Sequence, residues 1–247
     1  MELKAILWDY DGTLVDSTRK NIRVTKEVLK HFIPEFEKHI PKALTSVEEY
    51  QKANYKYKNW KELYEQAYGL TIEQIEQAGK LWSPYQLQDD SIPELFEGLL
   101  DIIPHLPVKA QGICSQNGAK SIESTLASYG LTSFFQAIIG VDEVGFGEQK
   151  PNPAGFLKCL AKLGIKDYED SILIYIGDHA EDVVFAKNAE KCLLEKLNIE
   201  NKNSTVTVIT IGVNYSGTEV LAWGMKPDYV VTVPKDIERI ISEIIKN

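Results

Sequence analysis

The stretch AILWDYDGTLVDS, residues 5–17, decides the fold, because an apolar run of strand type ends there in two aspartates set one residue apart. Ionised carboxylates repel each other and are costly to bury without a partner. Asp-Gly is also a good turn former, so the stretch by itself would suit a simple turn. It fails as a calcium loop of the EF-hand type, which needs glycine sixth and glutamate twelfth, because counting from Asp9 puts Gly12 fourth and Lys20 twelfth.

Five further apolar runs follow along the chain, and runs this apolar are typical of strands that are covered on both faces of a parallel sheet. The six predicted strands are residues 3–9, 108–115, 136–140, 171–178, 205–213 and 228–233. Helical patterns lie between or after them, at residues 119–130, 151–164, 181–197 and 235–246. This alternation predicts an α/β fold with a doubly wound, Rossmann-like parallel sheet.

Residues 16–90 interrupt the alternation. They contain helical patterns with Pro34 and Pro84 as punctuation, and they contain no convincing strand. We therefore expect a helical insertion directly after the first strand. The predicted domains are a core of residues 1–15 and 91–247 and a helical domain of residues 16–90.

Composition limits the possible functions. The 247 residues are 44% hydrophobic, which is enough for a sizeable core. The net charge is -9 and no basic run occurs, so the composition argues against nucleic acid as a partner, because phosphate contacts need clustered Lys and Arg. We see no signal peptide and no apolar run of about 20 residues, and we expect a soluble, cytoplasmic protein without a membrane partner. The three cysteines are expected to be free, buried thiols.

Polar residues follow several of the predicted strands, and ligands of open parallel sheets bind outside the carboxyl ends of the strands. The residues brought to that edge would be Asp9, Asp11, Ser115, Lys150, Asp178 and Asp182. Clustered carboxylates suit a hard cation such as Mg²⁺, which would relieve their mutual repulsion. A hydroxyl and an ammonium group beside the cation would hold an anion. The set is therefore typical of a phosphoryl-transfer site.

Four segments in this order, DYDGT, ICSQNG, KPNP and GDHAED, resemble the four motifs of the haloacid dehalogenase-like (HAD) hydrolase superfamily. The helical insertion lies where the type-1 (C1) cap domain of that superfamily lies. The likeness extends to the branch that resembles phosphoglycolate phosphatase. It implies a Mg²⁺-dependent phosphatase, a phosphoric monoester hydrolase that acts on a small phosphorylated metabolite through an aspartyl-phosphate.

The resemblance also implies catalytic and substrate-binding roles. Asp9 would be the nucleophile, and Asp11 would protonate the leaving group and then activate water. Lys150 would hold the nucleophile and the phosphate together. The residues that would bind the substrate are Ser115, Gln116, Asn117 and Lys150.

The metal ligands implied by the resemblance are Asp9, Asp178 and the backbone carbonyl of Asp11. Asp182 would lie behind them and orient Lys150. His179 stands where small hydroxyl residues are commoner in such proteins, and we interpret it as accessory or incidental. We expect the chain to be a monomer or a homodimer.

Taken one at a time, the motifs have simpler explanations. Ser115 alone would be interpreted as the cap of the following helix, and Lys150 alone as a surface lysine. Asp178 and Asp182 alone would be acidic residues at a helix N-terminus. In the helical domain, tyrosines recur every seven residues at Tyr50, Tyr57 and Tyr64, a pattern that favours helix packing over a substrate platform.

Alternative functions stay open at this point. A sugar phosphomutase of the same superfamily has the same core, and a non-catalytic binding protein could retain the fold. A 2-haloacid dehalogenase usually lacks the second acidic residue, so Asp11 argues against that activity. A phosphonate hydrolase would need a lysine of the cap domain that forms a Schiff base with the substrate.

Overall fold

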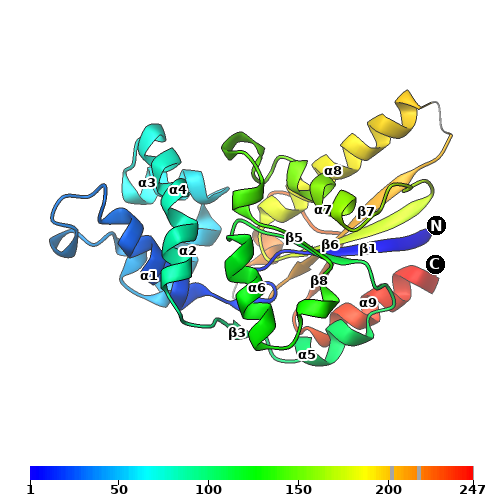
Figure 1. The fold of residues 1–247 in the computed structure, drawn as a ribbon, viewed down its shortest axis with the longest axis horizontal. Helices are drawn as coiled ribbons and strands as arrows, with labels where there is room; N and C mark the ends of the chain where they lie inside the picture. The colour runs from blue at the N-terminus through cyan, green and yellow to red at the C-terminus, as the bar shows by residue number, and fades with distance from the viewer. Residues whose placement is uncertain (201–202, 216–217, 247) are drawn as a thin grey trace. The chain divides into compact units, whose positions relative to one another are not determined.

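The structure is a computed structural model that describes residues 1–200, 203–215 and 218–246. The chain divides into two compact units. We name Met1–Val15 with Leu95–Asn247 the core unit, and Asp16–Glu94 the inserted unit. Figure 1 shows the sheet of the core unit and the helices of the inserted unit.

A six-stranded sheet forms the centre of the core unit, with the order β5-β4-β1-β6-β7-β8. Every neighbouring pair in it is parallel. The strands are β1 (Glu2–Trp8), β4 (Gln111–Cys114), β5 (Ala137–Ile139), β6 (Ser171–Gly177), β7 (Val206–Val213) and β8 (Tyr229–Val231). All six predicted strands are present, and the predicted doubly wound α/β fold is confirmed.

The chain order in the sheet places a switch point at β1. From β1 the chain first builds β4 and β5 on one side, and then crosses to build β6, β7 and β8 on the other. Trp8, the last residue of β1, lies opposite Ile113 of β4 and Ile176 of β6. The carboxyl ends of these three strands are therefore nearly level, and such a switch point is where open α/β sheets bind ligands.

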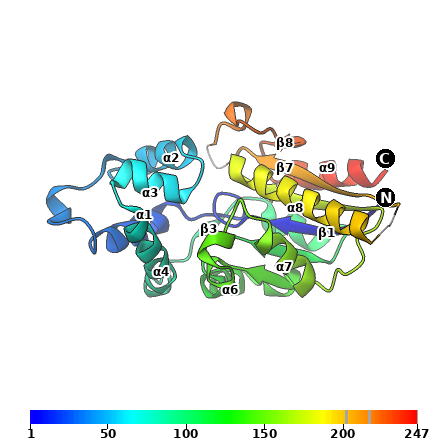
Figure 2. The same cartoon turned by 90° about the horizontal axis from the view of Figure 1, so that it is seen from above.

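Helices cover both faces of this sheet, because its strands carry apolar side chains on both faces and these must be buried away from water. On one face are α5 (Leu99–Ile102), α6 (Ala119–Ser128) and α9 (Lys235–Lys246). On the other are α7 (Ala154–Lys162) and α8 (Ala180–Ile199), whose Phe156 and Phe185 rings meet 5.9 Å apart. Figures 1 and 2 show the helices on opposite sides of the strands.

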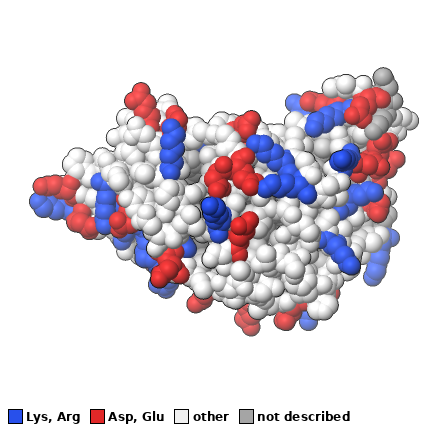
Figure 3. Space-filling model, in the orientation of Figure 1, with Lys and Arg blue, Asp and Glu red and all other residues white. Residues whose placement is uncertain are grey.

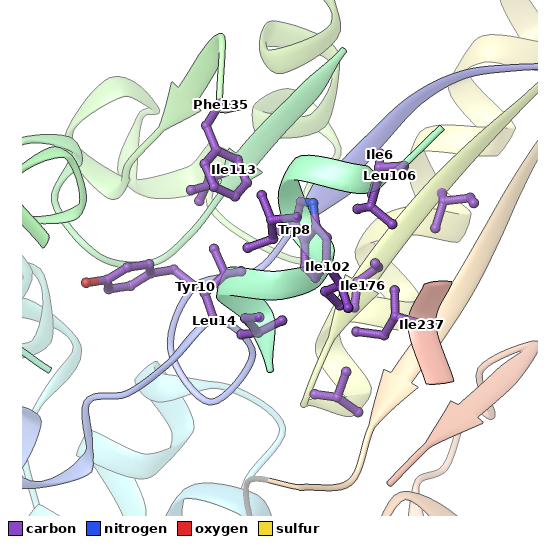
Figure 4. Packing of buried hydrophobic residues seen from close by; sticks show 14 of the residues in the cluster. Ile6, Trp8, Tyr10, Leu14, Ile102, Leu106, Ile113, Phe135, Ile176 and Ile237 are labelled. Carbon is purple, nitrogen blue, oxygen red and sulfur yellow. The ribbon is translucent and has the colours of Figure 1, made fainter. Parts of the chain in front are cut away.

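Trp8 lies at the centre of the first of these two packed clusters, among Ile102, Leu106 and Ile113 (Figure 4). Its indole nitrogen donates a hydrogen bond to Gln111 Oε1 at 3.1 Å, and Gln111 Nε2 donates to the carbonyl of Ile103. These bonds satisfy polar groups that would otherwise be buried at a cost. The end of β1 is thus fixed where the candidate site begins.

The inserted unit is helical, as its sequence predicts. Its helices are α1 (Thr18–Leu29), α2 (Val47–Lys56), α3 (Trp60–Tyr68) and α4 (Ile72–Gln88). Ser46, Asn59 and Thr71 each cap the backbone of the next helix through a side-chain oxygen. These three caps explain where helices α2, α3 and α4 begin.

Pro84 is a correction to the sequence analysis, which took it as punctuation. It lies inside α4, four residues before the helix ends. Proline removes one backbone donor from a helix and crowds the carbonyl of the fourth residue before it. The bond lost here is the one to the carbonyl of Lys80, and the helix nevertheless continues past Pro84 to Gln88.

The tyrosine pattern does not lie on one helix, because Tyr50 belongs to α2 and Tyr64 to α3, while Tyr57 follows the end of α2. Tyr64 packs edge-on against Trp60 and Tyr68, with ring centroids 5.4 and 5.0 Å apart. Tyr50 and Tyr64 are buried. The expected role in helix packing is confirmed for these two rings.

Two short strands connect the units, and the sequence analysis did not predict them. The strand β2 (Val15–Asp16) pairs with β3 (Glu94–Leu95), where the chain leaves and re-enters the core unit. The backbone nitrogen of Phe96 also donates to the carbonyl of Leu14 at 3.1 Å. The two crossings are thus hydrogen-bonded to each other.

The surface carries mixed charge, and the expectation of buried thiols holds for two of the three cysteines. On the face shown in Figure 3, Lys and Arg side chains are interspersed with Asp and Glu. Cys114 and Cys159 are buried free thiols, and Cys192 is a half-buried one. None of the helices within residues 1–200, 203–215 and 218–246 is long and apolar enough to cross a membrane.

Candidate active site

The loop after β1 carries Asp9 and Asp11 past the end of the sheet. The backbone nitrogen of Asp9 still donates to the carbonyl of Ile176 at 2.8 Å, which extends the strand pairing by one residue. The loop then turns back, because Leu14 N donates to the Tyr10 carbonyl at 2.9 Å. These backbone bonds hold the Asp9 carboxylate at the sheet edge.

Gly12 brings this loop against the Asp178 carboxylate. Its φ is +73°, a conformation that L side chains rarely adopt. A Cβ atom added at Gly12 would lie 2.1 Å from Oδ2 of Asp178, far inside contact distance. Only glycine therefore allows the first motif and the fourth to approach this closely.

Lys150 joins two of the predicted motifs in one buried ion network. Its Nζ lies 2.6 Å from Asp9 Oδ1 and 2.7 Å from Asp182 Oδ1, and these three side chains are at most 10% exposed. Lys150 follows the short 3₁₀ turn Phe146–Glu148, so a segment far from β1 in the sequence supplies the ammonium group. The network shows that Lys150 is not an ordinary surface lysine.

Asp182 is held in place from several sides. Its Oδ2 accepts a hydrogen bond from the His179 backbone nitrogen at 3.0 Å, while its Oδ1 faces Lys150. A Cβ atom at Gly177 would lie 2.4 Å from Asp182 Cγ, so the carboxylate lies directly against the end of β6. His179 caps α8 through Nδ1, which accepts from Glu181 N at 3.1 Å. This capping role of His179 was not predicted.

Three acidic side chains in the core unit are close enough to share a cation. One oxygen each from Asp9, Asp178 and Asp182 lies within 4.8 Å of the others, and all three residues are buried. Buried oxygen ligands at this spacing suit a divalent cation. The Asp11 carboxylate instead faces Asn117.

The electrostatics of the network follow from burial and from the neighbouring charges. Burial raises the pKa of the Asp9 carboxyl well above its ordinary value; the Lys150 ammonium opposes this rise, and the neighbouring aspartates add to it. Burial alone would lower the pKa of Lys150, but the Asp182 and Asp9 carboxylates raise it, so the ammonium stays charged. A divalent cation beside Asp9 would favour its ionised form and bring its pKa down again.

The second motif follows β4 and lies on the Asp11 side of the site. The backbone nitrogen of Ser115 donates to the Ile139 carbonyl at 3.0 Å, and its Oγ accepts from Asn117 N at 3.1 Å. Gln116 Nε2 lies 3.3 Å from Glu181 Oε2, at the start of α8. The Ser115 hydroxyl oxygen thus accepts one hydrogen bond from the backbone, and its own proton can be donated to an anion.

Tyr175 contacts the ion network of Lys150 and Asp182, and the sequence analysis did not predict this contact. It is buried in β6, and its hydroxyl donates to the Cys114 carbonyl at 3.0 Å. The same hydroxyl lies 3.5 Å from Asp182 Oδ1, and its ring centroid lies 5.3 Å from the Lys150 Nζ. In the sequence Tyr175 looks like one more apolar strand residue, so only the fold reveals that it connects β4 to the ion network.

Comparison with known proteins places these features in a family. The family model for haloacid dehalogenase-like hydrolases matches residues 6–193. Pyrophosphatase PpaX of Listeria welshimeri is 26% identical over 251 residues, which cover 98% of each chain. A phosphoglycolate phosphatase of Cereibacter sphaeroides is 26% identical over 118 residues, covering 47% of this chain and 51% of that protein.

The fold agrees with solved structures. A candidate haloacid dehalogenase-like hydrolase from Bacteroides fragilis superimposes with a TM-score of 0.69 at 22% identity, covering 96% of this chain and all of the other. A hydrolase from Pseudomonas syringae gives a TM-score of 0.63 at 20% identity, covering 98% of this chain and 99% of that one. Because the family match extends over well more than half of the sequence, the resemblance predicted from the four motifs is confirmed, and the chain belongs to the haloacid dehalogenase-like hydrolase family.

Proposed function

We propose that this chain is a Mg²⁺-dependent phosphatase that hydrolyses a small phosphorylated metabolite through an aspartyl-phosphate on Asp9. One observation carries the proposal: the Lys150 ammonium is buried between Asp9 and Asp182, at 2.6 and 2.7 Å. A charged lysine there fixes the nucleophilic carboxylate and offers positive charge to the phosphoryl group. Uncatalysed phosphate-monoester hydrolysis is extremely slow, so preorganised charge of this kind is what catalysis requires.

In the first step an oxygen of Asp9 forms a bond to phosphorus, and the bond from phosphorus to the leaving oxygen breaks. Asp11 donates its proton to that leaving oxygen. Ser115 donates its hydroxyl hydrogen to a phosphoryl oxygen, and Lys150 remains bound to the nucleophilic carboxylate. A divalent cation held by Asp9 and Asp178 would supply positive charge that offsets the repulsion between the phosphoryl oxygens and Asp9.

In the second step the Asp11 carboxylate takes a proton from a water molecule. The water oxygen bonds to phosphorus, and the bond from phosphorus to Asp9 breaks. Inorganic phosphate leaves, Asp9 is again a carboxylate, and Asp11 is again protonated for the next cycle. Asp11 thus serves as acid in one half-reaction and as base in the other.

We assign the cation to the side chains of Asp9 and Asp178, with the backbone carbonyl of Asp11 as a third ligand by family resemblance. Asp182 is assigned a supporting role, because its two oxygens already accept hydrogen bonds from Lys150 and from the His179 backbone. We assign Mg²⁺ to this site because these ligands are hard oxygen donors, which Mg²⁺ would bind.

We assign the inserted unit the role of a cap domain that excludes bulk water and selects the leaving group, as the family resemblance implies. Helical caps of this kind act by closing over the substrate. A cytoplasmic location and a monomer or homodimer remain predictions from the sequence.

Inorganic pyrophosphate is a second candidate substrate, because the Listeria welshimeri relative that covers 98% of this chain is named a pyrophosphatase. The same residues would serve that reaction. Phosphate would be the leaving group, and it is a better one than an alkoxide, so protonation by Asp11 would matter less.

The test is phosphate release from a panel of pyrophosphate, 2-phosphoglycolate, sugar phosphates and nucleotides, with Mg²⁺ and with EDTA. Asp9→Asn removes the nucleophile, and we expect it to lower kcat by at least about 10³-fold. Asp101→Asn, at an exposed position of α5, is the matched control. Acid-quenched protein should carry one phosphoryl group on the Asp9 peptide in the wild type and none in Asp9→Asn.

Each outcome separates the alternatives. Release that needs both Mg²⁺ and Asp9 supports the proposal, and the best substrate identifies the leaving group. Conversion of a sugar 1-phosphate to a 6-phosphate without release would establish a phosphomutase instead. Loss of all turnover on the whole panel, with Mg²⁺ bound and no phosphorylated Asp9, would favour a non-catalytic binding protein.

A further inference from the structure

Asn117 is the side chain in the second motif that reaches toward the first. Its Nδ2 lies 3.3 Å from Oδ1 and 3.2 Å from Oδ2 of Asp11. The residue is buried, with 2% of its surface exposed. An amide donor within hydrogen-bond range of both oxygens limits rotation of the Asp11 carboxylate.

The rest of Asn117 is fixed by the protein. Its Oδ1 accepts a hydrogen bond from Gly118 N at 2.9 Å, which determines which end of the amide faces Asp11. Its backbone nitrogen donates to Ser115 Oγ, and its backbone carbonyl accepts from Val141 N at 2.9 Å. The side chain is therefore already oriented before any substrate binds.

This arrangement differs from the role that the sequence analysis gave to Asn117. A substrate ligand needs polar atoms that face the substrate. Here the amide oxygen is used by Gly118 N, and the amide nitrogen faces Asp11. The side-chain contacts of Asn117 in this structure are thus to Gly118 N and to the Asp11 carboxylate.

We propose that Asn117 is a positioning residue that holds the Asp11 carboxyl group in the orientation needed for proton transfer. This inference rests on the proposed phosphatase function. Because Nδ2 is close to both Asp11 oxygens, the contact is retained whichever oxygen carries the proton. Asn117 thus supports Asp11 both when it donates a proton to the leaving group and when it accepts one from water.

The same residue couples the acid to the phosphate-binding hydroxyl. The Asn117 backbone nitrogen orients Ser115, while its side chain orients Asp11. A single residue of the loop after β4 therefore sets the relative position of the group that binds the phosphoryl oxygens and the group that protonates the leaving oxygen. Such prepositioning is a recognised source of rate enhancement.

The experiment compares two aryl esters, phenyl phosphate and p-nitrophenyl phosphate, in the Mg²⁺-loaded protein. Phenolate is the more basic leaving group, so its departure depends more on protonation by Asp11. We measure kcat/KM, which reports transfer to Asp9, and the inhibition constant for inorganic phosphate. The variants are Asn117→Ala, which removes the amide, and Asn117→Asp, which keeps the acceptor for Gly118 N and replaces the donor with an oxygen.

We expect Asn117→Ala to lower kcat/KM for phenyl phosphate roughly tenfold more than for p-nitrophenyl phosphate, a fraction of what a general acid contributes. Asn117→Asp should lose at least as much, since a second carboxylate would face Asp11. The inhibition constant for phosphate should stay within about twofold. Asp11→Asn gives the limiting ratio between the two esters, and thermal unfolding confirms that each variant is folded.

With an active enzyme, three results would overturn the inference. An equal loss on both esters would mean a merely structural role. A raised inhibition constant for phosphate would make Asn117 a substrate ligand, as the sequence analysis had it. Better activity in Asn117→Asp than in Asn117→Ala would show that the donor to Asp11 is dispensable. If the unaltered protein releases no phosphate from these esters or from the metabolite panel, the proposed function fails, and this inference fails with it.

Discussion

The core unit contains two ion pairs that are buried on both sides, whereas the ion pairs described in the inserted unit each have an exposed basic partner. In the core unit Lys150 is 6% exposed and bonds carboxylates that come from β1 and α8. In the inserted unit the pairs Lys30–Glu27 and Lys80–Glu76 are exposed and lie one helical turn apart. Exposed pairs of the second kind contribute little to stability, whereas a buried charge needs every one of its partners.

Lys20 is the exception within the inserted unit. It is buried, and its Nζ donates to the backbone carbonyls of Asp89 and Ser91 at 2.8 and 3.0 Å. These bonds connect α1 to the segment that leads back to the core unit. The comparison teaches that burial of a charge marks the places where segments distant in the chain must be held together.

The largest expected effect is that of Lys150→Met. It leaves Asp9 and Asp182 buried without their counter-ion, so we expect about 3 kcal/mol of destabilisation without divalent cation and roughly 10²–10³-fold loss of kcat. Urea unfolding and phosphate release measure the two effects. Lys158→Met, which removes an exposed partner of Glu148, is the control and should change stability by less than about 1 kcal/mol. Equal effects of the two variants would break the comparison between buried and exposed charge.

Gly12→Ala should have the next largest effect. The new Cβ would collide with the Asp178 carboxylate in addition to the strain of a positive φ, so we expect divalent-cation affinity to fall at least about tenfold. The measurement is calorimetric titration with Mg²⁺. Gly69→Ala, at the end of α3, has the same φ of +73° but no atom within 4 Å of the new Cβ. It should cost about 1 kcal/mol in stability and leave cation binding unchanged, so a loss of binding there would contradict the argument.

Tyr175→Phe tests a single buried hydrogen bond. Loss of the hydroxyl leaves the Cys114 carbonyl without this donor, and we expect about 1 kcal/mol of destabilisation with a measurable fall in kcat. Thermal unfolding and steady-state kinetics measure both. The control is Tyr85→Phe in α4, whose hydroxyl lies 2.6 Å from His31 Nε2 at an exposed position. A larger stability loss in Tyr85→Phe would reverse the expected order.

The smallest effect concerns pH. The Arg23 guanidinium and Ser91 lower the pKa of Asp89 to about 2. A carboxyl whose pKa is lower in the folded than in the unfolded state stabilises the fold above its unfolded pKa of about 4. That contribution is lost as the pH falls from about 4 through 2. Asp89→Asn should therefore cost well under 1 kcal/mol at pH 7, and the difference from wild type should shrink in urea unfolding at pH 3. A difference that is constant with pH would sink this prediction.

Sequence reasoning predicted the sheet because each of its strands is an apolar run, long enough to be covered on both faces. It placed Asp9 and Asp178 correctly at strand ends. Open parallel sheets bind their ligands outside the carboxyl ends of the strands, so polar residues at that edge could be identified as site residues. It also placed Lys150 at the same edge, in the segment after the third predicted strand, and the family resemblance gave that residue its role. These features depend on local pattern and on the order of motifs along the chain.

What the sequence could not predict depends on contacts between distant segments. Tyr175 looks like any strand residue until the fold places its hydroxyl against Cys114. The amide of Asn117 has several possible partners in the sequence, and only the geometry selects Asp11. Pro84 was taken as punctuation because local rules treat proline as a helix breaker, whereas α4 continues through it to Gln88.

The pairing of β2 with β3 has a consequence for how such a chain can change over time. The pairing of β2 with β3 and the bond from Phe96 N to the Leu14 carbonyl hold the two crossing segments together, so the residues between β2 and β3 are not needed to join them. The inserted unit is therefore a separable insertion whose two ends are held at fixed positions. It can lengthen, shrink or be exchanged for another while the catalytic apparatus is inherited intact, and new leaving-group preferences can arise without redesign of the buried charges.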